Sequence, residues 1–529
     1  MTNSIEEIKY AKGIFVIGAN PVENHPVIGS KIRRAKAEGA RLVVADPRKV
    51  GLAKIADIHL PLKPGTNVAL VNGIMNIIIS KNLVDKEYLT KHTEGYEELV
   101  DMIREYTPEK VADICELPKE DIIEAAKIYA LSDVASIFYA MGVTQHSTGT
   151  NGVISLSNLA LITGNIGKLG GGLNPLRGQN NVQGACDMGC LPNNYPGYQK
   201  VTTPEVQSKF KKAWDVENLS EEVGLTVTEV PDAILEDRVK LLYIMGENPV
   251  ISDPDTAHIT KALKKVDFLI VQDLFLTETA EYADIVLPAG AFAEKDGTFT
   301  NTERKIQRIR KAVDAPGEAK ADWIILSELL NRMGVVANYT HPREIMEEIA
   351  EVTPQYGGIS YERISNDGLQ WPCPTKGHPG TKFLHENGPA RGKGLIKGVA
   401  HQDSAETPCE KYPIILTTGR NLYHFHTKTM TGRVEGLNIK SDKGYVEVNP
   451  KLLKKYGIED GERIKVTSRR GSVETTVRSN DGIISSTIFM PFHFAEAAAN
   501  ILTNTVLDSI AKIPELKVST VRIEKIKVS

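Results

Sequence analysis

The same set of polar residues occurs twice in this chain of 529 residues. Each copy has an apolar stretch, a Gly-x-Asn-Pro turn and a second apolar stretch that ends at an aspartate. Amides and carboxylates can bind the polar edges of a nucleotide, and ligands of open α/β sheets sit at the carboxyl ends of strands. The repeat therefore predicts two similar ligands, or one ligand with two similar ends. The recurring residues are Gly18, Asn20 and Asp46 in the first copy and Gly246, Asn248 and Asp273 in the second.

A duplicated fold whose turns favour Gly and Asn is the alternative explanation of the repeat. It accounts for the glycines but not for the aspartate that follows each second apolar stretch, so we favour ligand binding. Neither turn is a Gly-x-Gly-x-x-Gly fingerprint, which disfavours the usual mode of NAD binding. The chain also has no phosphate-binding Walker loop.

Arg177 lies in a polar, glycine-rich segment, residues 164–197, without helix or strand periodicity. Its guanidinium could bind a carboxylate through two parallel hydrogen bonds, and the neighbouring Gln179 and Asn180 offer neutral amides. A structural arginine that pairs with Asp187 or a backbone carbonyl is the alternative. Because the segment is rich in donors and acceptors, we interpret it as a functional loop rather than a linker.

Residues 417–433 form a further polar cluster, in which His424 and His426 are expected on one face of an extended segment. Two histidines could ligate a metal, but no third ligand is nearby, so hydrogen bonding to a heterocycle is the preferred interpretation. A solvated polar face remains the alternative. A third cluster combines residues 491–494 with Asn500.

Composition excludes several classes of function. The formal net charge of −4 gives no general attraction to nucleic acid or to a membrane, and no apolar run is long enough to span a bilayer. Five cysteines without a Cys-x-x-Cys pair cannot supply a clustered zinc or iron–sulfur site, so we expect no metal ligand. No leader-like segment follows Met1, which predicts a cytoplasmic protein.

The elements that would position these residues alternate between apolar strands and helical stretches, one of them at residues 88–130. This alternation predicts an α/β fold with two doubly wound, Rossmann-like domains related by the repeat. Short β-runs after Tyr412, with a hairpin turn at Arg470-Gly471, predict an all-β barrel. We expect the two α/β domains at residues 1–179 and 180–373, a linker at 374–410 and the barrel at 411–529.

Three segments carry a specific resemblance: GGLNPLRGQNNVQGACDMGCLPNNYPGY, MGVTQ and GRNLYHFHTKTMTGR. Through them the chain resembles, over its whole length, the catalytic alpha subunits of molybdenum or tungsten formate dehydrogenases, in the dimethyl-sulfoxide-reductase superfamily. The resemblance implies two molybdopterin guanine dinucleotides on one metal, Mo or W, with one dinucleotide in each α/β domain. It also implies a double-psi barrel that closes over both.

The resemblance further implies an activity and a partner. Formate would be oxidised to CO2 in anaerobic metabolism, and two electrons would pass to an electron-transfer subunit of iron–sulfur, flavin or hydrogenase type. An assimilatory nitrate reductase-type enzyme is one alternative, because residues 417–433 resemble both. A scaffold that binds the dinucleotides without redox chemistry is the other.

The resemblance assigns roles to individual residues. Arg177 matches the arginine that holds formate beside the metal, and Gln179 and Asn180 are expected to contact the cofactor. The residues matched to the first dinucleotide site and its surroundings are Gly18, Asn20, Asp46, Arg48, Gly65, Asn67, Met141, Gly142 and Gln145. Those matched to the second site are Gly246, Asn248, Gln272, Asp273 and Asp322. The barrel's contacts are expected at Gly419, Arg420, His426, Thr427, Asn500 and Lys517.

The chain departs from the family in one respect. Family members begin with a domain that holds a [4Fe-4S] cluster, and they then supply a selenocysteine or cysteine, followed by a histidine, to the metal. Neither element is found in this sequence. We therefore expect that the reading frame continues upstream of Met1 through a selenocysteine codon, and that residues 1–529 alone do not oxidise formate.

Overall fold

The computed structural model describes residues 1–526, which belong to two units. Unit 1 comprises Met1–Leu176, Ile251–Ala257 and the chain from Phe383 onward. Unit 2 comprises Arg177–Val250 and His258–Lys382. Each unit contains one copy of the repeat, and the barrel belongs to unit 1.

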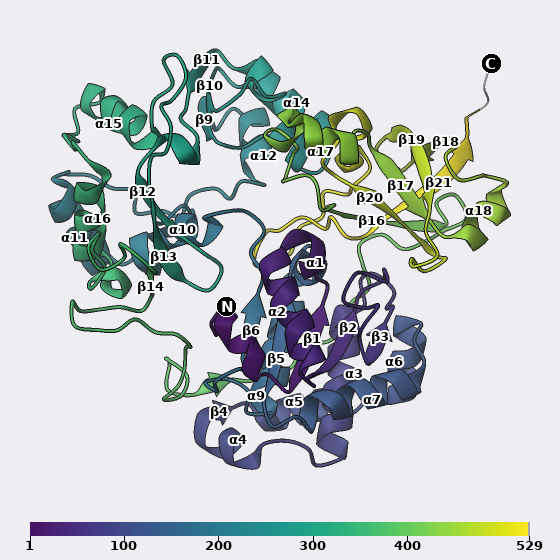
Figure 1. Cartoon of the computed structure of the whole chain (residues 1–529). Helices are drawn as coiled ribbons and strands as arrows, with labels where there is room; N and C mark the ends of the chain where they lie inside the picture. The colour runs from purple at the N-terminus through teal and green to yellow at the C-terminus, as the bar shows by residue number, and fades with distance from the viewer. Residues whose placement is uncertain (527–529) are drawn as a thin grey trace. The chain divides into compact units, whose positions relative to one another are not determined.

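A five-stranded parallel sheet forms the core of unit 1 (Figure 1). Its strand order is β3-β2-β1-β5-β6. The order of the strands along the chain reverses between β1 and β5, which makes the gap at their carboxyl ends the place where such sheets bind ligands. The strands are β1 (Gly13–Ile17), β2 (Arg41–Ala45), β3 (Ile58–Leu60), β5 (Ala135–Tyr139) and β6 (Leu173–Pro175).

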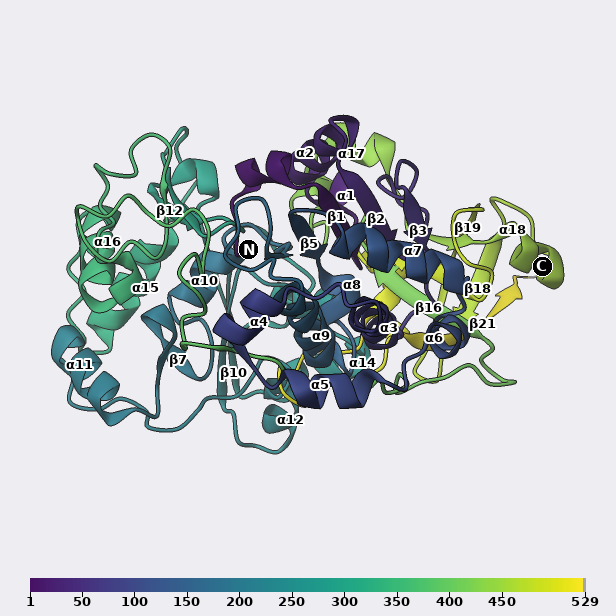
Figure 2. The ribbon, with the colours of Figure 1, turned by 90° about the horizontal axis from the view of Figure 1, so that it is seen from below.

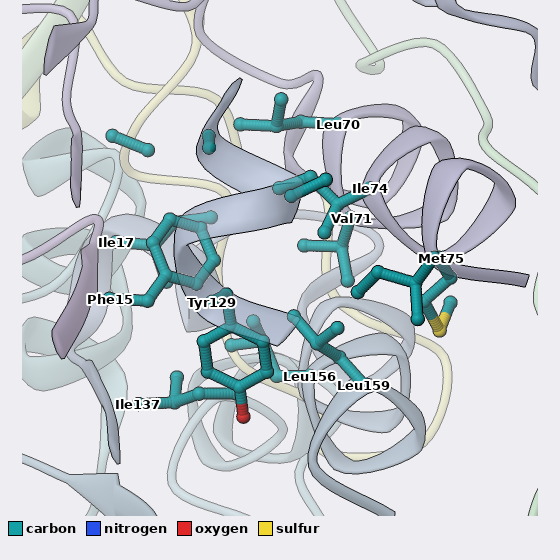
Figure 3. Close-up of a cluster of buried hydrophobic side chains, with 14 of the residues drawn as sticks. Phe15, Ile17, Leu70, Val71, Ile74, Met75, Tyr129, Ile137, Leu156 and Leu159 are labelled. Atoms are coloured by element: carbon teal, nitrogen blue, oxygen red, sulfur yellow. The ribbon is translucent and has the colours of Figure 1, made fainter. Parts of the chain in front are cut away.

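Helices cover both faces of this sheet, as the doubly wound prediction requires. Successive residues of β1 alternate between two hydrophobic clusters, so that Phe15 and Ile17 contact one and Ile14 and Val16 the other. In Figure 3, Phe15 lies beside Tyr129, with which it makes an edge-on ring contact. The first cluster contains α3 (Asn67–Ser80), α7 (Lys119–Ala130) and α9 (Gly149–Ile162), and the second contains α2 (Pro26–Ala37).

The helical stretch expected between two apolar strands is confirmed as a group of four helices after α3. Of these, α6 and α7 pack beside α3 (Figure 2), and they bury its apolar residues. Proline at the start of α6, after a Thr107 cap, fixes where that helix begins. The helices are α4 (Lys86–His92), α5 (Tyr96–Ile103), α6 (Pro108–Cys115) and α7.

Unit 2 repeats the first three strands of unit 1. Its parallel sheet has the order β11-β10-β9, which corresponds to β3-β2-β1. The turn glycines are held alike, because Gly18 donates to Ala45 O and Gly246 donates to Gln272 O, each at 2.9 Å. The strands are β9 (Leu241–Met245), β10 (Phe268–Asp273) and β11 (Ile285–Pro288). The predicted structural repeat is confirmed.

Asp57 and Asp284 show why an Ala-Asp-Ile sequence recurs in both copies. The Asp57 carboxylate accepts the N–H of Leu42, and the Asp284 carboxylate accepts the N–H of Leu269, each at 2.7 Å. Each aspartate therefore satisfies a backbone donor of the second strand. This recurrence is structural and does not need a ligand.

The rest of unit 2 contains a small antiparallel sheet of order β12-β13-β14 and several helices. Its strands are β12 (Gly297–Thr300), β13 (Lys305–Ile309) and β14 (Leu369–Gln370), and its main helices are α11 (Pro204–Trp214), α15 (Asp322–Arg332) and α16 (Pro342–Val352). The polar segment 164–197 is not wholly irregular, since it contains β6, α10 (Val182–Asp187) and β7 (Asn194–Tyr195). These elements are too short to produce a periodic pattern.

The C-terminal part of unit 1 is a closed six-stranded barrel, as predicted, of order β16-β20-β17-β19-β18-β21. Residues of alternate positions fill its interior, among them Leu416, Val446 and Val477. The expected hairpin at Arg470-Gly471 joins β18 to β19. The strands are β16 (Ile414–Gly419), β17 (Tyr445–Val448), β18 (Arg463–Thr467), β19 (Ser472–Ser479), β20 (Thr487–Pro491) and β21 (Ser519–Lys525).

The segment between the second α/β region and the barrel has little regular structure. Its one strand in the described chain is β15 (Gly394–Leu395), which pairs with β4 (Thr93–Glu94). Within residues 1–526, no helix combines the length and the apolar character needed to cross a bilayer.

Candidate cofactor-binding site

Two turns meet at the carboxyl ends of β1 and β5. The Gly142 N–H donates to the Gly18 carbonyl oxygen at 2.9 Å. Gly18 has a φ of +55°, and a Cβ built on it would lie 2.6 Å from the backbone of Gly142. Only glycine fits such an approach, because the backbones themselves are in contact. The two turns form the floor of the gap at which the strand order reverses.

Buried amide and imidazole groups line the same place. Asn20 is 6 % exposed, and in the described structure neither its Oδ1 nor its Nδ2 has a hydrogen-bond partner. Asn67 donates to Gly142 O at 3.1 Å, and its amide lies 3.2 Å from Nε2 of His146. Burial lowers the pKa of His146 to about 4, so this ring is neutral at pH 7. A buried polar atom without a hydrogen-bond partner lowers the stability of a protein. Asn20 therefore fits a site in which a bound ligand supplies the missing hydrogen bonds.

Asp46 and Arg48 follow β2. The Asp46 carboxylate accepts the Arg48 N–H at 2.9 Å, and burial raises the pKa of this carboxyl group despite the nearby arginine. The guanidinium carbon of Arg48 lies 3.6 Å from the ring centroid of Phe489, and Nη1 lies 3.5 Å from a Glu447 oxygen. These contacts hold both residues at the carboxyl end of β2, against the barrel.

Positive charge is concentrated around Asp46. Lys517 donates from Nζ to Thr418 O at 2.8 Å, and burial, with Arg420 and Arg48 nearby, lowers its pKa to about 7. Burial also lowers the pKa of Arg420. Three crowded cations with one adjacent carboxylate are stabilised by a polyanion such as a diphosphate.

The expected extended segment around His424 and His426 is wrong. His426 has a φ of +45° and lies in no strand, and the His424 ring bonds back to Ser441 O at 2.5 Å. His493 donates from Nδ1 to His426 O at 2.5 Å. Burial lowers the pKa of His426 to about 4 and that of His493 to about 3. Neutral rings of this kind can bind a heterocycle, while His424 has a structural role.

The remaining expected residues of unit 1 differ in how many of their polar groups already have hydrogen-bond partners within the protein. Met141 is the first residue of α8 (Met141–Thr144), and the Gln145 carbonyl accepts the Lys517 N–H at 3.3 Å. Asn500 donates to the carbonyl oxygens of Ile251 and Ser252 at 3.0 and 2.8 Å, which leaves only its Oδ1 without a partner in the described structure.

Three further positions are closely packed. A Cβ on Gly65 would lie 2.3 Å from Ser404 Oγ, and one on Gly419 would lie 2.6 Å from the Phe489 ring. Thr427 is 3.0 Å from the hydroxyl of Thr429.

In the second copy of the turn, the side-chain amide of Asn248 forms its hydrogen bonds with protein groups. Asn248 donates to Glu278 at 2.7 Å and accepts from the Thr279 hydroxyl at 2.7 Å. Gly246 has a φ of +64° like Gly18, but nothing lies within 4 Å of a Cβ built on it. The Asp273 carboxylate accepts the Leu274 N–H at 2.6 Å. The two copies therefore share their backbone but not their polar partners.

A buried chain of hydrogen bonds joins the end of β10 to the start of α15. Gln272 is fully buried, accepts from the Tyr243 hydroxyl and donates to Asp322 at 2.6 Å. Asp322 also pairs with Lys295. Lys295 and Asp322 line a cavity of about 230 Å³, together with Phe299, Trp323 and the N-terminal half of α16.

Arg177 lies where unit 2 begins. Its N–H donates to Thr302 Oγ1 at 3.2 Å, and its guanidinium lowers the pKa of the Cys186 thiol against the larger effect of burial. Gln179 is half-buried and Asn180 is exposed. Whether Arg177 lies near the residues of unit 1 stays a prediction.

Several residues of these clusters escaped sequence reasoning. None has a local signal that separates it from an ordinary core or surface residue. They are His59, whose Nε2 lies 2.9 Å from the Asp46 carbonyl oxygen, and His146, Tyr243, Lys295 and Phe489. Their roles follow from contacts between distant segments, which spacing alone does not reveal.

The donor set of unit 1 fits a nucleotide-like polyanion. It combines a buried amide without partners, neutral imidazoles and three cations at a switch point. Over residues 1–526, no group of three or more His, Cys, Asp or Glu side chains is arranged to hold a metal ion.

Family models match two regions of the chain. Residues 1–332 match the model described as "Molybdopterin oxidoreductase". Residues 414–520, which span the barrel, match the model described as "Molydopterin dinucleotide binding domain". The first match covers more than half of the chain and includes both copies of the repeat.

Named relatives agree with these models. The chain is 52 % identical to the F420-dependent formate dehydrogenase subunit alpha of Methanocaldococcus jannaschii, over 99 % of this chain and 78 % of that protein. It is 40 % identical to formate dehydrogenase H of Escherichia coli, over 99 % of this chain and 74 % of that protein.

A solved structure has the same fold. Acetylene hydratase from Pelobacter acetylenicus superposes with a TM-score of 0.79 at 22 % identity, over 98 % of this chain and 78 % of that chain. At this identity the likeness speaks for the fold alone. From the two family models and the relatives together, the chain belongs to the molybdopterin oxidoreductase family.

Proposed function

We propose that this protein is the catalytic alpha subunit of a formate dehydrogenase and oxidises formate to carbon dioxide. One observation carries the proposal: the chain is 52 % identical, over 99 % of its length, to a formate dehydrogenase alpha subunit. The buried side-chain amide of Asn20, which has no hydrogen-bond partner in the described structure, supports a ligand at the switch point. The residue that would bind formate, Arg177, is present in a loop rich in neutral amides.

The cofactor we propose is a molybdopterin guanine dinucleotide pair with molybdenum or tungsten. In unit 1, Asn20, Asp46 and Asn67 would bind one dinucleotide by hydrogen bonds, while Arg48, Arg420 and Lys517 would neutralise its phosphates. Gln272, Asp273 and Asp322 of unit 2 would bind the other. When bound, the metal centre would accept two electrons from the substrate.

Arg177 would orient formate. A guanidinium binds both oxygens of a carboxylate at once, and so fixes the direction of the C–H bond. The reaction is balanced as HCOO⁻ giving CO2, one proton and two electrons. Positioning of this kind contributes on the order of 7 to 11 kcal/mol at best.

The electrons would leave to a partner. We propose an electron-transfer subunit of iron–sulfur, flavin or hydrogenase type, in the cytoplasm. We place neither a metal ligand nor an iron–sulfur relay among residues 1–526, where no group of three or more His, Cys, Asp or Glu side chains is arranged to hold a metal ion.

Purification of the tagged chain from its own host under anaerobic conditions tests this proposal. The complex should contain molybdenum or tungsten and a pterin dinucleotide, and it should reduce a viologen dye with formate. Dye oxidation with nitrate but not with formate would assign a nitrate reductase, and bound dinucleotide without either turnover would assign a scaffold. Both results contradict the proposal.

A further inference from the structure

Asp187, the last residue of α10, is a buried carboxylate, 1 % exposed, bound by four neutral donors. It accepts from Gln183 Nε2 at 2.8 Å and from the Tyr198 hydroxyl, the Tyr356 hydroxyl and Trp371 Nε1 at 2.7 Å each. One donor belongs to α10 itself and one, Tyr198, follows it closely, whereas Tyr356 and Trp371 lie 169 and 184 residues away in the chain. One side chain therefore fixes the end of α10 to several elements of unit 2.

The donors keep their protons. Burial and the adjacent Asp187 raise the pKa of both Tyr198 and Tyr356 well above its usual range. Both hydroxyl groups therefore stay protonated and can donate to Asp187 across the neutral pH range.

The loop that carries Arg177 is bound at its other end as well. The Arg177 N–H donates to Thr302 Oγ1 at 3.2 Å, and Asn181 Oδ1 accepts the Thr300 N–H at 2.9 Å. The Thr300 hydroxyl is in turn 3.1 Å from the Tyr356 hydroxyl. Tyr356 thus links the start of the loop to Asp187 at its end.

The side chain of Arg177 acts on Cys186, which precedes Asp187 in α10. Burial raises the pKa of the Cys186 thiol, and the charge of the Arg177 guanidinium opposes this rise. Arg177 also acts electrostatically on Tyr198, although burial dominates there. The guanidinium therefore lies near the residues that bind Asp187. A change in its distance from Cys186 should change the pKa of the Cys186 thiol.

We propose that Asp187 is the positioning residue for Arg177: through Tyr198 and Tyr356 it holds α10 so that the guanidinium keeps one place and orientation. This inference rests on the proposed function only in naming formate as the ligand of Arg177. A side chain that must orient a small carboxylate has to be fixed itself, because a small displacement of a positioning group costs rate.

The pH dependence of Cys186 alkylation in the full chain measures the placement of Arg177 without any turnover. The exposed thiols are removed by Cys190→Ser and Cys409→Ser, and Cys115 and Cys373 are buried. Arg177→Gln is the reference, because it removes the opposing charge. It should slow alkylation of Cys186 at pH 8 by about threefold to tenfold, since the thiolate fraction falls as the apparent pKa rises.

Tyr198→Phe is the test variant, because it removes one donor to Asp187 without changing any charge. Its apparent pKa for Cys186 should move in the same direction as in Arg177→Gln, with alkylation at pH 8 slowed at least about twofold. Tyr361→Phe is the matched control, since Tyr361 is 3 % exposed and its hydroxyl has no partner in the described structure. It should leave the profile of Cys186 unchanged.

Two results of this experiment would contradict the inference. If Tyr198→Phe matches Tyr361→Phe while Arg177→Gln shifts the profile, Asp187 does not position Arg177 and the inference is wrong. It is equally wrong if Arg177→Gln has no effect on Cys186. Because formate is absent from the experiment, neither result bears on the proposed function, which the kinetics of the assembled enzyme test separately.

Discussion

Gly142 donates its N–H to the carbonyl oxygen of Gly18 at 2.9 Å, so the turns after β1 and β5 are in backbone contact. Those strands are neighbours in the sheet although more than a hundred residues separate them in sequence. The contact fixes the floor of the switch point, above which Asn20 and Asn67 lie. The proposed dinucleotide site of unit 1 therefore depends on two residues without side chains.

Gly18→Ala should lower the free energy of unfolding by about 2 to 4 kcal/mol, from left-handed strain and from overlap with the backbone of Gly142. Gly457→Ala is the control, because Gly457 has a φ of +62° and nothing within 4 Å of an added Cβ. It should cost about 1 kcal/mol. Urea unfolding measures both, and equal losses would mean that the close approach to Gly142 is unimportant.

Lys517 should make the chain without cofactor more stable at alkaline pH. Burial, with Arg420 and Arg48, lowers its pKa in the folded state to about 7. The unfolded lysine has a pKa of about 10.4, so between these values the unfolded state binds more protons and the free energy of unfolding rises with pH. In Lys517→Met this rise between pH 7 and pH 9 should be smaller by about 2 kcal/mol.

Urea unfolding at the two pH values provides the measurement for Lys517, with Lys454→Met on an exposed helix surface as the control. The control should keep the pH dependence of the wild type. An unchanged pH dependence in Lys517→Met would show that Lys517 is well solvated and is not part of a crowded cation cluster.

Asp57→Ala and Asp284→Ala should both lower the free energy of unfolding, because each leaves the N–H of a second strand without its acceptor. The expected loss is about 1 to 3 kcal/mol for each variant. Asp57→Asn and Asp284→Asn keep an acceptor oxygen and should lose less than half as much. Thermal or urea unfolding decides; a negligible loss in either alanine variant would contradict the structural role of the repeat.

Arg177→Lys should raise the formate KM and lower kcat of the assembled enzyme, because lysine keeps the charge but loses the two-pronged geometry. Arg177→Ala should lower kcat/KM further, by more than about a hundredfold, or roughly 3 kcal/mol of transition-state stabilisation. Metal and pterin contents provide the control and should stay at the wild-type level. Kinetics like those of the wild type in Arg177→Ala would remove this residue from the substrate site.

Regular elements with strong patterns were predictable from the sequence. The recurring Gly-x-Asn-Pro turns predicted two copies of a parallel sheet, and short β-runs with a turn at Arg470-Gly471 predicted a closed barrel. The segment around His426 was wrongly predicted as extended, because hydrogen bonds from His424 to Ser441 and from His493 to His426 outweigh local alternation.

The site was predictable only in part, since its geometry depends on contacts between distant segments. Asp46 could be singled out from the repeat, but its proximity to Lys517 joins residues at opposite ends of the chain. The repeat also predicted equal roles for Asn20 and Asn248. Of these two side-chain amides, only that of Asn248 has hydrogen-bond partners in the described structure. Sequence similarity between the copies did not reveal that difference.

We propose that this chain binds a molybdopterin dinucleotide and, in its assembled complex, oxidises formate. The most direct measurement is formate-dependent dye reduction by the complex purified with the tagged chain, normalised to its molybdenum or tungsten content. Turnover with formate should rise in proportion to bound metal, and Arg177→Ala should lose turnover at unchanged metal content. Metal-loaded complex that turns over nitrate but not formate, or a complex without pterin, would contradict it.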